Sequence, residues 1–157
     1  MTLIANSAPL WGIAGLIIAG GVYLFIKRQP AGSDLMQGIA AQIHEGAMVY
    51  LKRQYSILVV FIVLVFAALS FGIGVWTAIA FLAGAVCSMS AGFFGMNAAT
   101  RANVRTAQAA HVNKNHPGKA LSMAFAGGSV MGLSVASLGL LGVGVFFLFF
   151  GHDPTQA

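Results

Sequence analysis

The acidic side chains of this chain are too few and too widely spaced for metal-dependent chemistry. Hydrolysis of a phosphate compound with Mg²⁺ needs carboxylates that converge on the metal. The sequence contains only Asp34, Glu45 and Asp153. Asp34 and Glu45 lie on one predicted helix, roughly 16 Å apart along its axis. We therefore expect no catalytic, cofactor-binding or metal-binding residue in this chain.

Histidines and arginines carry weaker chemical signals. His111 and His116 lie close in sequence, but no Cys or carboxylate joins them, so we interpret both as residues of a solvated loop. His44 is interpreted as an interfacial histidine. Arg101 and Arg105 lie one helical turn apart and fit either a substrate phosphate or lipid headgroups and membrane orientation. Their spacing does not choose between these roles.

The lysines and arginines fall in two short windows, separated by long uncharged stretches. Residues 1–26, 54–100 and 120–151 contain no Asp, Glu, Lys, Arg or His. A charged side chain at the bilayer centre costs about 2.5–3.5 kcal/mol, so such stretches are typical of membrane-spanning helices. The eight basic residues are Lys27, Arg28, Lys52, Arg53, Arg101, Arg105, Lys114 and Lys119.

The composition excludes several other classes of protein. The chain is 59% hydrophobic and 7% charged, with a net charge of +5. The basic residues flank apolar runs and form no basic domain, so we expect no nucleic-acid partner and a lipid bilayer instead. Cys87 is the single cysteine and lies in an apolar run, where we interpret it as a packing residue rather than part of a disulfide or a metal site.

An all-α membrane protein follows from this pattern, as a single transmembrane unit. The predicted spans are residues 8–26, 56–71, 75–96 and 120–150, with segments 27–55 and 97–119 in the cytoplasm. These two segments hold every Lys and Arg. The positive-inside rule therefore places both chain termini outside the cytoplasm.

The first cytoplasmic segment predicts a separate amphipathic helix over residues 34–55. Asp34 and Gln37 suggest a capping box at its start. Its apolar stripe is Leu35, Ile39, Ile43, Ala47, Leu51 and Tyr55. This stripe fits a protein partner or lipid equally well. The helix leads into the span 56–71, which ends in a tight turn at residues 72–74.

Two faces of small residues predict close contacts between helices in lipid. They are Ala80, Gly84, Ser88 and Gly92, and Ala124, Gly128, Gly132 and Ala136. The last uncharged run is longer than one bilayer crossing, so it must tilt, protrude or break. Gly139, Gly142 and Gly144 mark the place where an irregularity is expected.

Three stretches together resemble one protein family. They are residues 38–55 with EGAMVYLKRQY, residues 95–110 with ATRANVRTAQAA, and residues 124–142 with AFAGGSVMGLSVASLGLLG. Their order and spacing resemble the N-terminal region of the membrane-bound, ion-translocating inorganic pyrophosphatases. The resemblance covers about residues 36–145. His44 departs from it, because the family often has Gln at that position.

The resemblance implies a sixteen-helix pump that forms homodimers in a bacterial inner (plasma) membrane. Such a pump couples hydrolysis of diphosphate at a Mg²⁺ site to translocation of H⁺ or Na⁺. Its catalytic and ion-gate residues lie on later helices, and the first four helices support them. No catalytic residue carries over to this chain, which we therefore expect to be inactive by itself.

Two hypotheses remain from the sequence. The chain is the N-terminal scaffold portion of such a pump, which the three motifs favour. Alternatively, it is an independent four-span protein that assembles with itself or with a partner subunit, which the small-residue faces favour.

Overall fold

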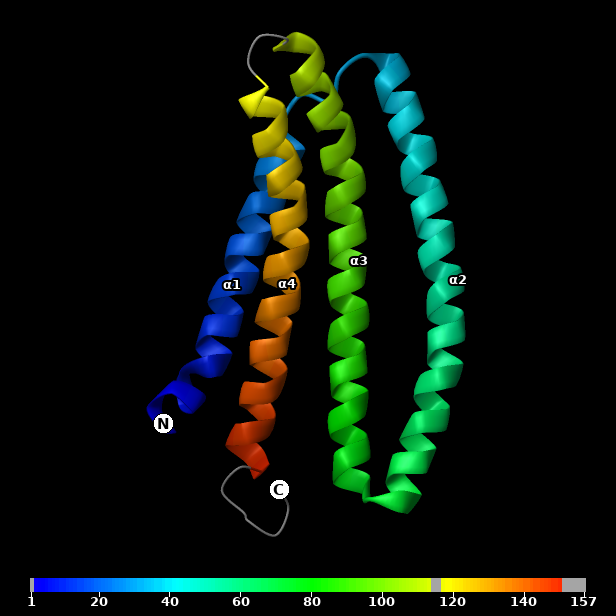
Figure 1. Ribbon diagram of the computed structural model, residues 1–157, viewed down its shortest axis with the longest axis vertical. Helices are drawn as coiled ribbons and strands as arrows, with labels where there is room; N and C mark the ends of the chain where they lie inside the picture. The colour runs from blue at the N-terminus through cyan, green and yellow to red at the C-terminus, as the bar shows by residue number, and fades with distance from the viewer. Residues whose placement is uncertain (1, 114–116, 151–157) are drawn as a thin grey trace.

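Four long helices make up the described part of the chain. The computed structural model describes residues 2–113 and 117–150. The helices are α1 (Thr2–Arg28), α2 (Asp34–Gly72), α3 (Val75–Val112) and α4 (Gly118–Phe150) (Figure 1). Each is long and apolar enough to cross a membrane, as the sequence predicts. The chain is thus an all-α integral membrane protein. The exact limits of the four spans stay predictions.

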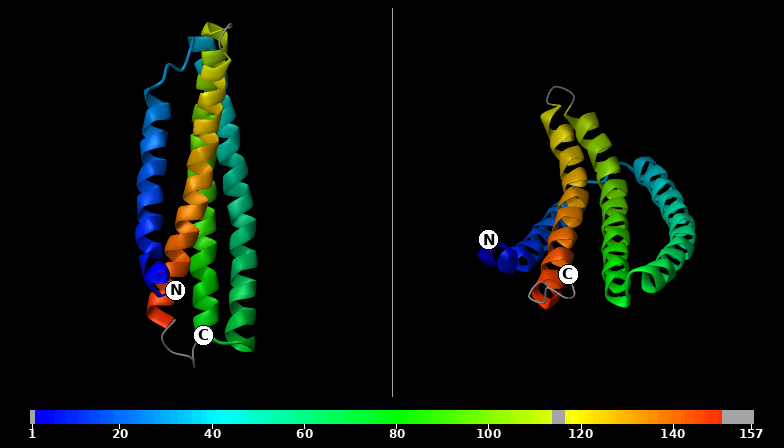
Figure 2. Two further views of the ribbon diagram at one scale, coloured as in Figure 1. Left: turned by 60° about the vertical axis from the view of Figure 1, so that its left-hand side comes forward. Right: turned by 60° about the horizontal axis from the view of Figure 1, so that its bottom comes forward.

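The helices stand side by side in a curved layer rather than in a closed bundle (Figures 1 and 2). Their spatial order is α1, α4, α3, α2, and within the described residues α2 contacts neither α1 nor α4. The ends of α1 and α3 and the start of α4 meet at one end of the layer, named here the Arg105 end. The turn between α2 and α3 lies at the opposite end, named the Gly74 end.

The helix α2 is continuous where the sequence suggests two helices. The predicted amphipathic helix 34–55 and the predicted span 56–71 form one helix of 39 residues. No proline interrupts it, so Lys52 and Arg53 change the polarity of its surface without ending its hydrogen-bond ladder. Likewise, α3 runs through the predicted boundary at residue 96. At about 58 Å, α2 extends far beyond a hydrocarbon core of about 30 Å.

The start of α2 differs by one residue from the predicted capping box. The N-cap is Ser33, whose hydroxyl accepts a hydrogen bond from the Met36 amide at 3.4 Å. Gln37 instead donates its side-chain amide to the carbonyl of Gly32 at 2.9 Å. Asp34 is the first helical residue, where its charge favours the helix dipole.

The predicted turn at residues 72–74 is present. Gly74 has φ +151° and ψ 156°, a conformation that side chains with a Cβ rarely adopt. Its amide donates to the carbonyl of Leu69 at 2.9 Å and so closes the end of α2. The glycine allows α3 to start immediately and return antiparallel to α2.

The buried residues of α3 and α4 recur at alternating intervals of four and three positions, not at the predicted constant interval of four. The buried positions of α3 along its contact with α4 are Ala91, Gly95, Ala98 and Ala102. The buried positions of α4 are Met123, Gly127, Val130, Ser134, Ser137 and Gly144, of which Ser137 and Gly144 pack against α1. All four residues of the predicted stripe from Ala124 to Ala136 are exposed. A step of four residues turns about 40° beyond a full helical turn, so such a stripe drifts off the contact.

The apolar stripe on α2 shows the same drift. Leu35 is 75% exposed and Ile43 is 44% exposed, whereas Leu51 is 8% exposed. The stripe therefore starts on an open surface and enters the contact with α3 only near Leu51. The start of the stripe is therefore exposed in the structure, and the part near Leu51 packs against a protein partner, α3.

The glycine-rich end of α4 is an unbroken helix, so the predicted irregularity is wrong. A Cβ at Gly144 would lie 2.7 Å from Pro9 Cδ, and a Cβ at Gly12 would lie 2.7 Å from the Ser137 carbonyl oxygen. These glycines permit α1 and α4 to pack backbone against backbone. Their role is close contact rather than a break.

Candidate functional site

The strongest polar cluster of the structure surrounds Arg105 on α3. Its Nε donates to the Gln29 carbonyl at 3.0 Å, and its Nη2 donates to the Lys27 carbonyl at 3.2 Å. Its Nη1 donates to the Arg101 carbonyl at 2.8 Å. The last carbonyls of a helix lack partners within it, and Arg105 satisfies one of them and the carbonyl just beyond. Arg105 therefore fastens the end of α1 to α3.

The structure separates the two arginines that the sequence pairs. The guanidinium of Arg105 directs three N–H groups at backbone carbonyls, whereas Arg101 is an exposed side chain. The role of Arg105 in capping α1 was missed by the sequence reasoning, because its partners lie more than seventy positions away. A phosphate contact by this pair stays a prediction.

His44 joins α2 to α3. Its Nδ1 lies 2.8 Å from the Thr100 hydroxyl oxygen. That hydroxyl also lies 2.9 Å from the Met96 carbonyl. The His44 ring and the Thr100 hydroxyl share this hydrogen bond, and the tautomer of the imidazole sets which of them donates. The residue interpreted as an interfacial histidine thus holds two helices together.

Tyr55 makes a second connection between the same helices. Its hydroxyl donates to the carbonyl of Met89, and a Cβ at Gly92 would lie 3.0 Å from its oxygen. Gly92 thus has a packing role, but toward α2. His44 and Tyr55 are eleven positions apart, close to three turns, so both lie on the side of α2 that faces α3.

The remaining candidate residues do not come together. Asp34 and Glu45 are both exposed on α2, and His111 is exposed near the end of α3. His116 and Asp153 lie outside the described residues. Among residues 2–113 and 117–150, no three His, Cys, Asp or Glu side chains are grouped to hold a metal ion.

A mixed polar cavity of about 420 Å³ lies at the Arg105 end. Its polar lining is Gln29, Arg105, Gln108, Asn113, Lys119 and Ser122. Two cationic side chains would favour an anion here, and among the described residues no carboxylate or histidine lines the cavity. The described lining therefore offers electrostatic attraction without a group for acid–base or metal-ion chemistry.

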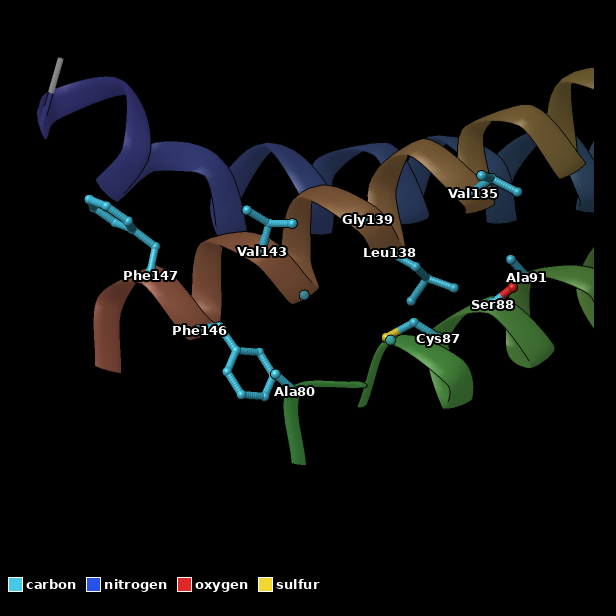
Figure 3. A pocket seen from close by; sticks show the side chains of 12 residues that line it. Ala80, Cys87, Ser88, Ala91, Val135, Leu138, Gly139, Val143, Phe146 and Phe147 are labelled. Carbon is cyan, nitrogen blue, oxygen red and sulfur yellow. The ribbon is translucent and has the colours of Figure 1, made fainter. Parts of the chain in front are cut away.

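A larger cavity of about 590 Å³ separates α3 from α4 toward the Gly74 end, and we name it the wedge. It is lined by Ala80, Gly84, Cys87, Ser88, Ala91, Val135, Leu138, Gly139, Gly142, Val143, Phe146 and Phe147. Figure 3 shows Leu138 of α4 pointing toward Cys87 of α3, and Phe146 reaching toward Ala80. The lining of the wedge, over the part of the chain that the structure describes, is apolar apart from Ser88 and Cys87, as expected of a packing surface.

Comparison with known protein families shows which family the chain belongs to. The family model described as inorganic H⁺ pyrophosphatase matches residues 13–157. The chain belongs to this family. The three sequence motifs predict this same family of pyrophosphate-driven membrane pumps.

Individual members of the pyrophosphatase family are similar over most of the chain. A Clostridium tetani protein, provisionally named a K⁺-stimulated pyrophosphate-energized sodium pump, is 49% identical over 92% of the chain. A K⁺-insensitive pyrophosphate-energized proton pump of Methanosarcina mazei is 42% identical over 92%. A K⁺-stimulated sodium pump of Thermotoga maritima is 41% identical over 92%.

The chain spans about a fifth of the length of these relatives. The matched share is 21%, 22% and 20% of the three proteins. Proton pumps and sodium pumps match it about equally, so the similarity of this segment does not identify the ion.

Proposed function

We propose that this chain is the N-terminal supporting layer of a pyrophosphate-energised ion pump. The complete pump hydrolyses diphosphate with Mg²⁺ at a cytoplasmic site, moves H⁺ or Na⁺, and works as a homodimer in a bacterial inner membrane. Residues 1–157 supply helices and anchoring contacts but no catalytic group. Both termini of this layer lie outside the cytoplasm.

The open layer is the observation that carries the proposal. Four helices packed in the order α1, α4, α3, α2 leave both faces of the layer uncovered. Four-helix bundles, by contrast, pack their helices around one shared core. Among the described residues the largest fully buried side chain, Ile26, belongs to a small cluster near the Arg105 end. Such a layer suits a position against further helices.

The side chains also fit a supporting role better than a catalytic one. A Mg²⁺ site needs several oxygen ligands around one point. Asp34 and Glu45 are exposed on one helix and roughly 16 Å apart along it, so the described residues do not fit a Mg²⁺ site. The polar side chains that do meet, Arg105, His44 and Tyr55, bond to neighbouring helices instead.

The alternative, an independent four-span protein, has less support. It relied on two small-residue stripes, but the stripe on α4 is exposed. Of the stripe on α3, Gly84 and Ser88 line an open cavity, and Gly92 packs against Tyr55 of α2. The family match and the relatives of more than four times its length favour a portion of a larger pump.

A chimera tests the proposal. The segment of the Thermotoga maritima pump that matches this chain is replaced by residues 1–157, and phosphate release from diphosphate and Na⁺ uptake are measured in membrane vesicles. We expect both activities to be retained. A chimera that reaches the membrane in normal amounts but neither hydrolyses diphosphate nor moves Na⁺ would contradict the proposed role.

A further inference from the structure

The wedge continues a contact that is tightly packed elsewhere. Along the same side of α3, the seam runs through Gly84, Ser88, Ala91, Gly95, Ala98 and Ala102 with the 4-3 alternation throughout. At its Arg105 half this seam is closed by α4. A Cβ at Gly95 would lie 2.6 Å from Met131 Cγ, and a Cβ at Gly127 would lie 2.6 Å from Ala102 Cβ.

At its Gly74 half the same seam is open. A Cβ at Gly84, Gly139 or Gly142 would meet nothing within 4 Å. The two helices diverge toward this end, as Figure 1 shows, and the wedge lies between them. The sequence thus keeps small residues along the entire seam, although α4 covers only part of it.

Small residues in this position indicate a protein occupant rather than lipid. Glycine weakens a helix and gives an acyl chain no added attraction, whereas it lets a second helix backbone approach closely. The wedge has one hydroxyl, that of Ser88, and one thiol, that of Cys87, and no charged side chain in its lining. Its occupant must therefore be apolar along this stretch.

We infer that the wedge receives a membrane helix from the part of the pump that lies outside residues 1–157. The inference rests on the proposed function, because the relatives are more than four times as long as this chain and the rest of the pump would supply the helix. The α3 wall of the wedge is built largely of small residues, among them Gly84, Ser88 and Ala91. With about 590 Å³ to fill, the helix inserts large apolar side chains such as Leu or Phe against this wall. It interlocks α3 and α4 at the end where they do not hold each other.

Photo-crosslinking in native membranes tests this inference. Val143 lines the wedge and is 73% exposed. It is replaced by benzoylphenylalanine in the protein expressed from its own gene, and crosslinked peptides are identified by mass spectrometry. We expect a peptide of the same protein from outside residues 1–157. Adducts with lipid alone, or only with peptides from within residues 1–157, would overturn the inference.

A pair of glycine variants adds a control. Gly84→Leu fills the wedge, whereas Gly21→Leu adds the same side chain to an exposed position of α1 where a Cβ also meets nothing within 4 Å. We expect loss of the crosslinked peptide with Gly84→Leu and its retention with Gly21→Leu. Equal crosslinking in the two variants would also contradict a helix in the wedge.

Diphosphate hydrolysis, measured on the same membranes, separates this inference from the proposed function. If the expected crosslink forms in a protein that does not hydrolyse diphosphate, the proposed function fails and the wedge still holds a helix. If the protein is active but Val143 labels only lipid, the wedge inference alone fails.

Discussion

The contact between α3 and α4 has two halves of opposite character. In the half near the Arg105 end, Gly95 and Gly127 are buried against Met131 and Ala102. In the half near the Gly74 end, Gly84 and Gly139 face open space although both halves are lined by small residues. Small residues therefore mark where a helix can approach, while only the structure tells whether this chain supplies that helix.

The largest expected effect sets these halves directly against each other. Gly95→Leu should destabilise the isolated chain by about 3 kcal/mol, because the new side chain overpacks against Met131. Gly84→Leu should not destabilise it and should stabilise it by up to about 1 kcal/mol, since the position is open and leucine favours a helix over glycine. Reversible unfolding in detergent micelles measures both. Equal destabilisation by the two variants would remove the contrast between the halves.

Two adjacent glycines of α4 refine the comparison within a single turn. A Cβ at Gly127 would meet Ala102, whereas a Cβ at Gly128 would meet nothing within 4 Å. Gly127→Ala should therefore destabilise the chain by about 1–3 kcal/mol, and Gly128→Ala should stabilise it by up to about 1 kcal/mol through helix propensity. Thermal unfolding in the same micelles separates the two, and a Gly127→Ala variant as stable as the parent would refute the packed seam.

Substitutions at the two arginines of α3 test which contacts hold the Arg105 end together. Arg105→Met removes three hydrogen bonds to backbone carbonyls and should cost about 2 kcal/mol, allowing for partial exposure. Arg101→Met, at an exposed position, should cost about 0.5 kcal/mol or less. Hydrogen exchange at residues 26–32 should rise in the first variant alone. Similar exchange in both would show that Arg105 does not fasten α1.

The smallest expected effect concerns the contact between α2 and α3. Thr100→Val removes the hydrogen-bond partner of His44 and should lower the unfolding free energy by about 1 kcal/mol. Thr106→Val is the matched control, since the Thr106 hydroxyl donates only to the Ala102 carbonyl of its own helix in the bonds described. Unfolding free energies measure the difference. If Thr106→Val lowers the unfolding free energy as much as Thr100→Val does, the effect comes from α3 itself and not from its contact with α2.

Local features of the fold were largely predictable from the sequence. The number of membrane-spanning stretches, the all-α class and the turn at residues 72–74 follow from uncharged runs and from glycine, because both act over a few residues. The joining of residues 34–55 and 56–71 into α2 was missed, since a change of polarity at Lys52 resembles a boundary. No proline or cap stands there to end the helix.

The arrangement of the helices was not predictable. Helices that are apolar on most sides carry no strong signal for which face meets which neighbour, so the order α1, α4, α3, α2 had to come from the structure. Arg105 and His44 form contacts with residues far away in sequence, and their identities alone suggested a phosphate or an interface. The wedge was not predictable for the same reason. Gly84 and Gly95 belong to one 4-3 pattern of small residues, and that pattern does not distinguish the open half of the contact from the packed half.

Complementation is the most direct test of a supporting layer without a catalytic site. The Thermotoga maritima pump is expressed without the segment that matches this chain, and residues 1–157 are supplied as a separate polypeptide in the same membranes. Release of phosphate from diphosphate with Mg²⁺ is then measured. We expect no release from either polypeptide alone and release from the two together. Release by residues 1–157 alone, or none from the pair when the pump's own segment restores activity, would contradict this role.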